Sequence, residues 1–288
     1  MLPARFDYQR PETLEEALFL LDRYGEDGKI LAGGQSLIPL MKLRFASPAY
    51  LVDINRIPGL GDIKESGGKL VLGALARHNE IADSDVITAR YPLVASAAPQ
   101  ISDPIVRNLG TVGGSLSHAD PAGDWGSVML ALGAEVVVRS SSGDRTLVID
   151  DFLRDTFTTD LRPNELLVEV RVPAPSPHSG GAYLKLERKV GDFATVGVAV
   201  QLALNDGHVA TAGIGLTAVG PKNLRARDAE ESLAGAEPGD AAFAKAARLA
   251  AAAAQPQSDV RGSADYKRHV VEVFVRRGLA RANQMAKA

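Results

Sequence analysis

Glycines and hydroxyl side chains are concentrated in one stretch near the middle of the chain. Residues 110–124, GTVGGSLSHADPAGD, contain four glycines and three hydroxyl side chains. Glycine adopts a positive φ without penalty and has no Cβ to keep a ligand from the backbone. Hydroxyl groups and free backbone N–H groups in such a loop suit phosphate oxygens. We therefore interpret this stretch as a phosphate-binding loop.

A second stretch of the same kind, AGGQS, occupies residues 32–36. It lies between a strand-like apolar run at 29–32 and a helix-like run at 37–43, whose N-terminal N–H groups would face the loop in an anion-binding geometry. Two such loops suggest a diphosphate held from two sides, and hence a dinucleotide. The alternative for either loop alone is a tight turn without a ligand.

The composition limits the function classes. The chain has 288 residues, of which 45% are hydrophobic and 23% charged, enough for one large or two modest cores. The formal net charge of −3 indicates neither nucleic acid nor an anionic membrane as partner. No stretch reaches the roughly 18 apolar residues of a membrane span, so we expect a cytoplasmic location.

The absence of cysteine is also informative. It excludes from this chain a cysteine nucleophile, iron–sulfur clusters held by cysteine and a cysteinyl flavin bond. The five histidines are far apart in sequence, so we expect no zinc site. No nucleophile–base–acid set is recognisable, and we expect no catalytic side chain.

The pattern of apolar residues predicts an α+β fold. Thr13 and Glu16 form a capping box before a helix, and a strand, helix and strand over residues 30–54 predict a parallel βαβ unit. The next part is expected to be antiparallel. Its predicted strands lie at 70–74, 134–138, 146–149 and 165–172, and its helices at 79–89, 93–101 and 123–132.

Three prolines and two glycines at residues 173–181 predict a boundary where no regular element continues. Beyond it we expect three strands, at 182–188, 194–204 and 209–218, followed by helices at 224–234, 241–254 and 264–284. The predicted domains are therefore residues 1–176, with subdomains of about 1–56 and 57–176, and residues 177–288.

Several of these motifs together resemble one family. They are the AGGQS and GTVGGS loops, the downstream ADPAGD, and Lys185 and Arg188 followed by Gly191-Asp192-Phe193-Ala194. The chain resembles the FAD-binding medium subunit of the molybdenum hydroxylases, the carbon monoxide dehydrogenase and xanthine dehydrogenase group. The resemblance covers the chain from Phe6 onward. It implies a vanillyl-alcohol oxidase (PCMH)-type fold of two FAD-binding subdomains, and a C-terminal domain with a three-stranded antiparallel sheet and helices.

The resemblance also implies which residues bind FAD. The two loops would hold the diphosphate, largely through backbone N–H groups, Asp124 would accept a hydrogen bond, and Ile101 would pack near the flavin or ribityl chain. Leu167 would lie beside the adenine and Lys185 near the isoalloxazine, with His118 as a further candidate over the flavin. The full expected set is Ile30, Leu31, Ala32, Gly33, Gly34, Gln35, Ser36, Leu37, Ile101, Gly110, Thr111, Val112, Gly113, Gly114, Ser115, His118, Asp124, Leu167 and Lys185.

Structural roles remain open for some of these residues. Asp124 could be a helix N-cap, His118 a hydrogen-bonded structural histidine, and Lys185 a surface charge. Trp125 could pack between domains, and Asp192 with Phe193 could either form an ordinary turn or lie at the flavin edge.

The expected function is electron transfer, since redox chemistry belongs to the cofactor. The resemblance implies noncovalent FAD in this chain, a small [2Fe–2S] subunit and a large molybdopterin subunit as partners, a dimer of heterotrimers, and an external electron acceptor. Two alternatives are a self-sufficient FAD-dependent oxidoreductase of the same fold and a non-catalytic subunit that has lost FAD.

Overall fold

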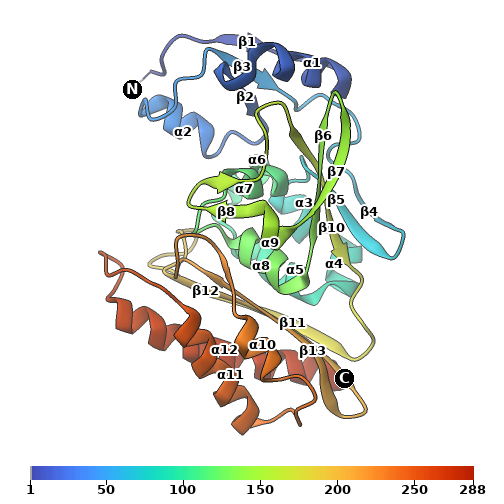
Figure 1. Ribbon diagram of the computed structural model, residues 1–288, viewed down its shortest axis with the longest axis vertical. Coiled ribbons are helices and arrows are strands. Elements are labelled where there is room, and N and C mark those ends of the chain that lie inside the picture. Colours follow the sequence, from blue (N-terminus) through green and yellow to red (C-terminus); the bar gives the residue numbers. More distant parts are fainter. Residues whose placement is uncertain (1) are drawn as a thin grey trace.

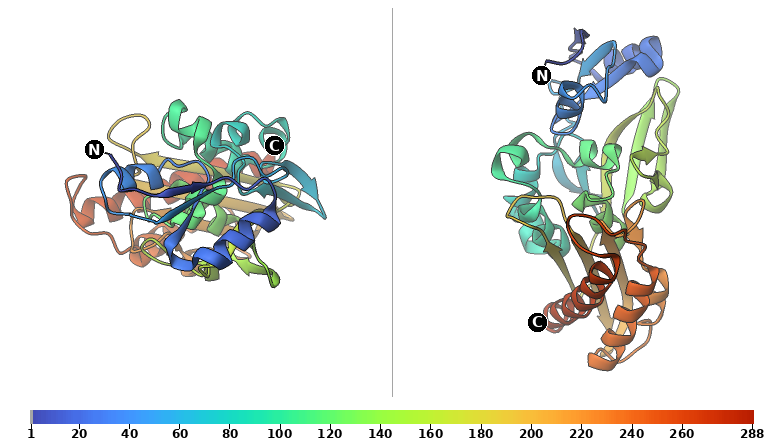
Figure 2. Two further views of the ribbon diagram at one scale, coloured as in Figure 1. Left: turned by 90° about the horizontal axis from the view of Figure 1, so that it is seen from above. Right: turned by 90° about the vertical axis from the view of Figure 1, so that its left-hand side faces the viewer.

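The computed structural model describes residues 2–288 and stacks three main sheets along its long axis (Figure 1). The N-terminal sheet lies at one end, a five-stranded sheet with several short helices occupies the middle, and a four-stranded sheet with two long helices forms the other end. The right-hand view in Figure 2, turned by 90° about the vertical axis, shows the same succession. In residues 2–288 no helix is both long and apolar enough to cross a membrane.

The N-terminal sheet is parallel and has the order β1-β3-β2. Its strands are β1 (Asp7–Gln9), β2 (Gly28–Leu31) and β3 (Tyr50–Asp53), with the 3-10 helix η1 (Gly25–Asp27) before β2. Helix α1 (Leu14–Tyr24) begins after Thr13, whose side chain accepts from the Glu16 N–H, and α2 (Leu37–Lys42) joins β2 to β3. The predicted βαβ unit is confirmed, whereas β1 was not expected from the sequence.

The middle sheet is antiparallel with the order β4-β5-β10-β6-β7. Its strands are β4 (Ile63–Ser66), β5 (Lys69–Gly73), β6 (Glu135–Ser140), β7 (Gly143–Val148) and β10 (Leu166–Pro173). A two-stranded ribbon of β8 (Leu153–Asp155) and β9 (Thr158–Thr159) follows the short helix α9 (Ile149–Phe152).

The helices of this part are shorter than the sequence predicted. They are α3 (His78–Ala82), α4 (Asp85–Arg90), α5 (Pro92–Ala97), the 3-10 helix η2 (Ala98–Gln100), α6 (Pro104–Leu109), α7 (Val112–His118) and α8 (Asp124–Leu132). The prediction of one helix over 79–89 is wrong, because the chain leaves the helix at Asp83 and Ser84 adopts an extended conformation before α4. Both residue types compete with helical hydrogen bonding and favour caps.

The second glycine stretch is largely a helix and not the loop that the sequence suggested. Thr111 is the N-cap of α7, and its side-chain oxygen accepts from the Gly114 N–H. A threonine cap satisfies one of the donors that a helix start leaves free. The cap therefore places Gly113 and Gly114 in the first helical turn.

The C-terminal sheet has the order β11-β12-β13-β14 and is antiparallel throughout. Its strands are β11 (Ser179–Leu186), β12 (Val196–Asn205), β13 (His208–Thr217) and β14 (Leu224–Arg225). The three long strands agree with the prediction, and β14 adds a short fourth strand where a helix was expected to begin. The helices are α10 (Arg227–Glu231), α11 (Asp240–Ala253) and α12 (Ala264–Lys287).

The end of the predicted linker belongs to a strand, since β11 already begins at Ser179. Glycines suit this position because neighbouring backbone and side chains approach closely. A methyl group on Gly180 would lie 2.6 Å from the Met285 Cβ on α12, and one on Gly181 would lie 2.6 Å from the Leu93 Cβ.

Helix α8 connects the middle and C-terminal sheets. Every residue from Asp124 to Ala131 is buried, and the helix lies against β12 and β13. Two glycines of β13 let the helix approach, because a methyl group on Gly213 or Gly215 would overlap carbonyl oxygens of α8. Ser127 and Thr217 also share a buried hydrogen bond of 2.6 Å. The position of Asp124 is therefore fixed by packing on both sides of its helix.

We predict that Gly215→Ala lowers the free energy of unfolding by about 1–3 kcal/mol, the usual cost of overpacking a filled core. A new Cβ would overlap the Ser127 carbonyl of α8. Thermal or denaturant unfolding measures the change. Gly61→Ala is the matched control, because nothing lies within 4 Å of its added methyl group. Equal stability of the two variants would show that α8 is not held by this contact.

Candidate cofactor site

A cavity of about 1040 Å³ lies where the three parts of the chain meet. Its wall includes β2 and α2, the second glycine stretch, the ribbon around β9, and β11 with the loop that follows it. Small-molecule sites commonly measure roughly 300–1,000 Å³. The cavity is thus large enough for a ligand of dinucleotide size.

Most of the residues expected to bind the cofactor line this cavity. They are Ile30, Ala32, Gly33, Gly34, Gln35, Ser36, Leu37, Ile101, Gly110, Thr111, Gly113, Gly114, Ser115, His118, Asp124, Leu167 and Lys185. Leu31 and Val112 do not contribute to the wall; Val112 is instead fully buried in the main core. The structure therefore brings both glycine stretches to one cavity.

The first stretch presents a row of unpaired backbone donors. The N–H groups of Gly33, Gly34, Gln35 and Ser36 make no hydrogen bond to any residue among 2–288. Gly34 has φ +73°, a left-handed conformation that glycine adopts without strain. Successive N–H groups around such a residue form a concave site for an anion. This stretch can hold a phosphate through its backbone.

The second stretch uses its backbone donors differently. The N–H groups of Val112 and Gly113 donate to Ala76 O and Ala74 O at 3.1 and 3.0 Å. The N–H groups of Gly114 and Ser115 donate to the side-chain oxygen and the carbonyl oxygen of Thr111. Among the described residues 111–115, the Thr111 N–H is therefore the only one left unpaired. The expectation that both stretches offer several backbone donors therefore fits only the first.

The two stretches touch at their glycines. A methyl group on Gly33 would overlap the carbonyl oxygen of Leu109 and lie 2.8 Å from the Gly110 Cα. A methyl group on Gly113 would lie 2.6 Å from the Ala74 Cβ, at the end of β5. Neither Gly33 nor Gly113 has a positive φ. These two glycines are therefore required for close packing within the protein. From the sequence we had instead explained them by their backbone conformation and by the space that a ligand needs.

Side chains between the stretches hold them together. Asn55 donates to the Ala32 carbonyl at 2.8 Å and is bonded in turn by Arg77 at 2.5 Å. Arg77 also donates to the Leu109 carbonyl, next to Gly110. Asp53 accepts from Asn55 and from Tyr8 of β1. This chain of contacts fixes the first stretch against the second.

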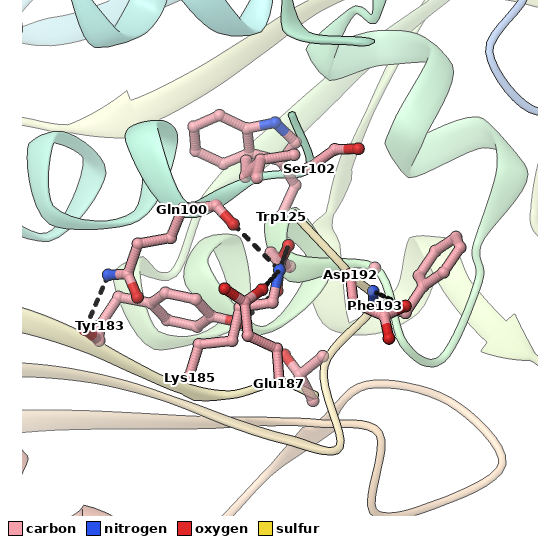
Figure 3. Close-up of polar contacts among 12 residues, drawn as sticks. Gln100, Ser102, Trp125, Tyr183, Lys185, Glu187, Asp192 and Phe193 are labelled. Carbon is pink, nitrogen blue, oxygen red and sulfur yellow. Dashed lines mark hydrogen bonds and ion pairs between the residues drawn. The ribbon is translucent and has the colours of Figure 1, made fainter. Parts of the chain in front are cut away.

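Asp124 is the acceptor in a buried polar cluster on the cavity wall. Figure 3 shows Lys185 of this cluster with Gln100, Tyr183 and Glu187 around it. Its carboxylate accepts from the Tyr183 hydroxyl at 2.5 Å and from the Lys185 ammonium at 3.0 Å. Lys185, whose side chain is 2% exposed, also donates to the Gln100 carbonyl and lies 3.5 Å from Glu187. Burial raises the pKa of Asp124, and the Lys185 ammonium offsets part of that rise.

This cluster decides two of the open alternatives. Asp124 is the first residue of α8 and Gly123 is the N-cap, so the carboxylate is not a helix cap. Lys185 is not a surface charge. A buried cation with two carboxylates beside it is held in one position, where it can face a ligand in the cavity.

Ile101 and Leu167 give the cavity apolar walls at separate places, Ile101 beside Gln100 and Leu167 on β10. His118 lines the cavity and packs against the ring of Phe157, with centroids 5.0 Å apart. Burial lowers the pKa of His118.

His78 is a cavity residue that the sequence reasoning missed. It is 5% exposed, lies at the start of α3, and accepts a hydrogen bond from the Trp125 indole at 3.0 Å. Burial, together with the charges of Arg107 and Arg77, lowers the pKa of His78 to about 4. The sequence signal was weak, because His78 lies several residues after the end of β5 and comes to the same cavity as the glycine stretches only in the fold.

The loop between β11 and β12 also reaches the cavity. Gly191, Asp192 and Phe193 line it, and Asp192 accepts from Arg188 and Arg261 at 3.1 Å each. Arg261 additionally donates to the Phe193 carbonyl at 2.7 Å. Phe193 lines the cavity and remains half-exposed, and its place at the flavin edge stays a prediction.

We predict that Asp124→Ala destabilises the protein by about 3–5 kcal/mol, because the change leaves the Lys185 ammonium buried without its main partner. Denaturant unfolding measures the loss, with Asp151→Ala on the exposed surface as control. The double variant Asp124→Leu, Lys185→Met should be more stable than Asp124→Ala alone. A cost below about 1 kcal/mol for Asp124→Ala would contradict the role given to the cluster.

Comparisons with known families cover nearly the whole chain. Residues 4–175 match the family model described as FAD binding domain in molybdopterin dehydrogenase, and residues 181–282 match the one described as CO dehydrogenase flavoprotein C-terminal domain. Among curated proteins, the carbon monoxide dehydrogenase medium chain of Hydrogenophaga pseudoflava is 44% identical over 97% of both chains.

Solved structures agree with the sequence matches. The carbon monoxide dehydrogenase of Hydrogenophaga pseudoflava, in a form lacking the Mo-pyranopterin moiety of its molybdenum cofactor, gives a TM-score of 0.96 at 45% identity over 99% of both chains. Quinoline 2-oxidoreductase from Pseudomonas putida gives 0.94 at 33% identity over 100% of both. With its cavity between two glycine stretches and both domain matches in order, the chain belongs to the FAD-binding medium subunits of the molybdenum hydroxylases.

Proposed function

We propose that FAD binds in the central cavity with its diphosphate on the N–H groups of residues 33–36. The observation that carries this placement is the row of unpaired donors beside Gly34, in contact with the second stretch. The Thr111 N–H and the Ser115 side chain, both on the cavity wall, would complete the phosphate site from the other side. Leu31 and Val112 would then support the two stretches from behind.

The remaining contacts assign the two ends of the cofactor. The end of the cavity that holds Ile101 and Lys185 would receive the isoalloxazine, where the Lys185 ammonium is held by Asp124 and the Gln100 carbonyl. The wall formed by Leu167 would receive the adenine. Asp124 has lone pairs left for a further donor from the cofactor, and His118 would border the flavin side.

The function that this site supports is electron transfer within a molybdenum hydroxylase complex. FAD, when bound, would supply the redox chemistry between [2Fe–2S] clusters of a partner and an external acceptor. The chain itself orients the cofactor and excludes water from its buried parts. We expect another subunit to determine the substrate. Enzymes with this same fold are named for different substrates, carbon monoxide in one case and quinoline in another.

We propose a large molybdopterin subunit and a small [2Fe–2S] subunit as partners, assembled as a dimer of heterotrimers in the cytoplasm. The chain has no cysteine with which to hold a cluster. Exposed apolar side chains near the cavity mouth support a partner on that face: Phe193 is 54% exposed and its neighbour Val190 is 93% exposed. We place the two domains at 1–176 and 177–288, with the subdomain boundary near residue 56.

Gly33→Ala should weaken FAD binding by roughly 5- to 150-fold, since overpacking costs about 1–3 kcal/mol and 1.4 kcal/mol is tenfold in affinity. The added methyl group would push residue 33 away from Leu109 and Gly110 and misalign the donor row. Flavin fluorescence during titration of the apoprotein measures affinity. The control Gly61→Ala, whose added methyl group has nothing within 4 Å, should bind FAD with native affinity. Equal affinity of the two variants would contradict the placement of the diphosphate at residues 33–36.

Substrate-dependent reduction of a dye should require this chain together with its molybdenum and iron–sulfur partners. The reason is that the chain offers a flavin site but no group of its own to oxidise an organic substrate. The assay compares the chain alone, each pair of subunits and the full complex, all loaded with FAD. Reduction of the dye at the full rate by the isolated chain would contradict this proposal and would indicate a self-sufficient flavoenzyme.

A further inference from the structure

His78 lies beside the contact between the two glycine stretches. Its backbone N–H donates to the Gly110 carbonyl at 3.1 Å. Its ring packs against the same glycine: a methyl group on Gly110 would lie 2.8 Å from both Cδ2 and Nε2 of His78. The Nε2 edge of the ring is therefore turned toward the second stretch, and the side chain forms part of the cavity wall.

The partner of the other ring nitrogen defines the tautomer. The Trp125 indole N–H donates to His78 Nδ1 at 3.0 Å, with Trp125 fully buried. An indole nitrogen can only donate, so Nδ1 must act as acceptor. A neutral imidazole with an accepting Nδ1 carries its proton on Nε2. The ring is neutral over the physiological range because its pKa is lowered to about 4.

The Nε2–H group has no hydrogen-bond acceptor among residues 2–288. Nε2 is not among the fully buried side-chain atoms that lack a partner, so this donor is accessible from the cavity, where an acceptor of a ligand can reach it. Two cations are close enough to lower the pKa of His78, the guanidinium groups of Arg107 and Arg77. The same positive potential favours a negatively charged group in front of the ring.

We propose that His78 is a further cofactor-binding residue, whose Nε2–H donates a hydrogen bond to the diphosphate of FAD. This inference rests on the proposed position of FAD in the cavity. Trp125 acts as a positioning residue, since its indole holds the tautomer that leaves the donor facing the ligand. The single tryptophan thus contributes to binding without touching the cofactor.

Two substitutions separate the ring nitrogens. In His78→Asn the amide oxygen can still accept from Trp125, but the donor at Nε2 is lost. In His78→Gln the longer amide can return a donor to that place. A hydrogen bond to a charged group is worth about 1.5–3 kcal/mol, so His78→Asn should bind FAD roughly 10- to 100-fold more weakly, while His78→Gln stays within about threefold of the native affinity.

The affinities come from flavin fluorescence, and binding of ADP, followed by calorimetry, should show the same order because ADP carries the diphosphate without the flavin. His208→Asn, on the exposed start of β13, controls for the substitution itself. Equal FAD affinity of His78→Asn and the native protein would overturn the inference, as would a loss with FAD that ADP does not share. A native protein that binds no FAD would instead overturn the proposed function.

A spectroscopic readout does not depend on either variant folding. With ¹⁵N-labelled histidine in the native apoprotein, the nitrogen shifts of His78 should report a neutral ring protonated at Nε2. On addition of FAD the Nε2 signal should move while the Nδ1 signal, bonded to Trp125, changes little. A ring protonated at Nδ1, or an Nε2 signal that ignores FAD, would contradict the assignment.

Discussion

The contact between the backbone at Gly33 and the backbone at Leu109–Gly110 is the constraint on which the rest of the site depends. The loop after β2 and the end of α6 can meet this closely only because no Cβ lies between them. Arg77 and Asn55 then fix the two carbonyls that flank the contact, at Leu109 and at Ala32. Both sides of this junction line the cavity, and so do residues 33–36 with their unpaired N–H groups.

The second requirement is the position of α8. Glycines of β13 let this helix pack against the C-terminal sheet, and its first residue, Asp124, thereby meets Tyr183 and Lys185 from β11. Its second residue, Trp125, reaches back to His78 beside the glycine junction. One buried helix therefore connects the expected flavin end of the cavity with its phosphate end. We infer that the domains cooperate in binding and that neither forms the site by itself.

The sequence predicted much of this because the informative signals are local. Glycine clusters, a capping box at Thr13 and apolar periodicity gave the βαβ unit, most strands and the cavity walls. The errors have physical causes. Capping by Thr111 turned an expected loop into α7, and the glycines at 33 and 113 serve close packing, which only the tertiary contacts reveal. His78 was missed because its partner Trp125 is 47 positions away in the chain, a pairing that no local pattern shows.

Hydrogen exchange of the backbone amides tests the central claim most directly, because the two glycine stretches differ in their internal hydrogen bonds. In the apoprotein, amides 33–36 should exchange rapidly, whereas amides 112–115, already bonded within the protein, should be protected. Addition of FAD should slow exchange at 33–36 and change 112–115 little. Protection that appears mainly at 112–115, with 33–36 unaffected, would contradict the account and assign the diphosphate to the second stretch.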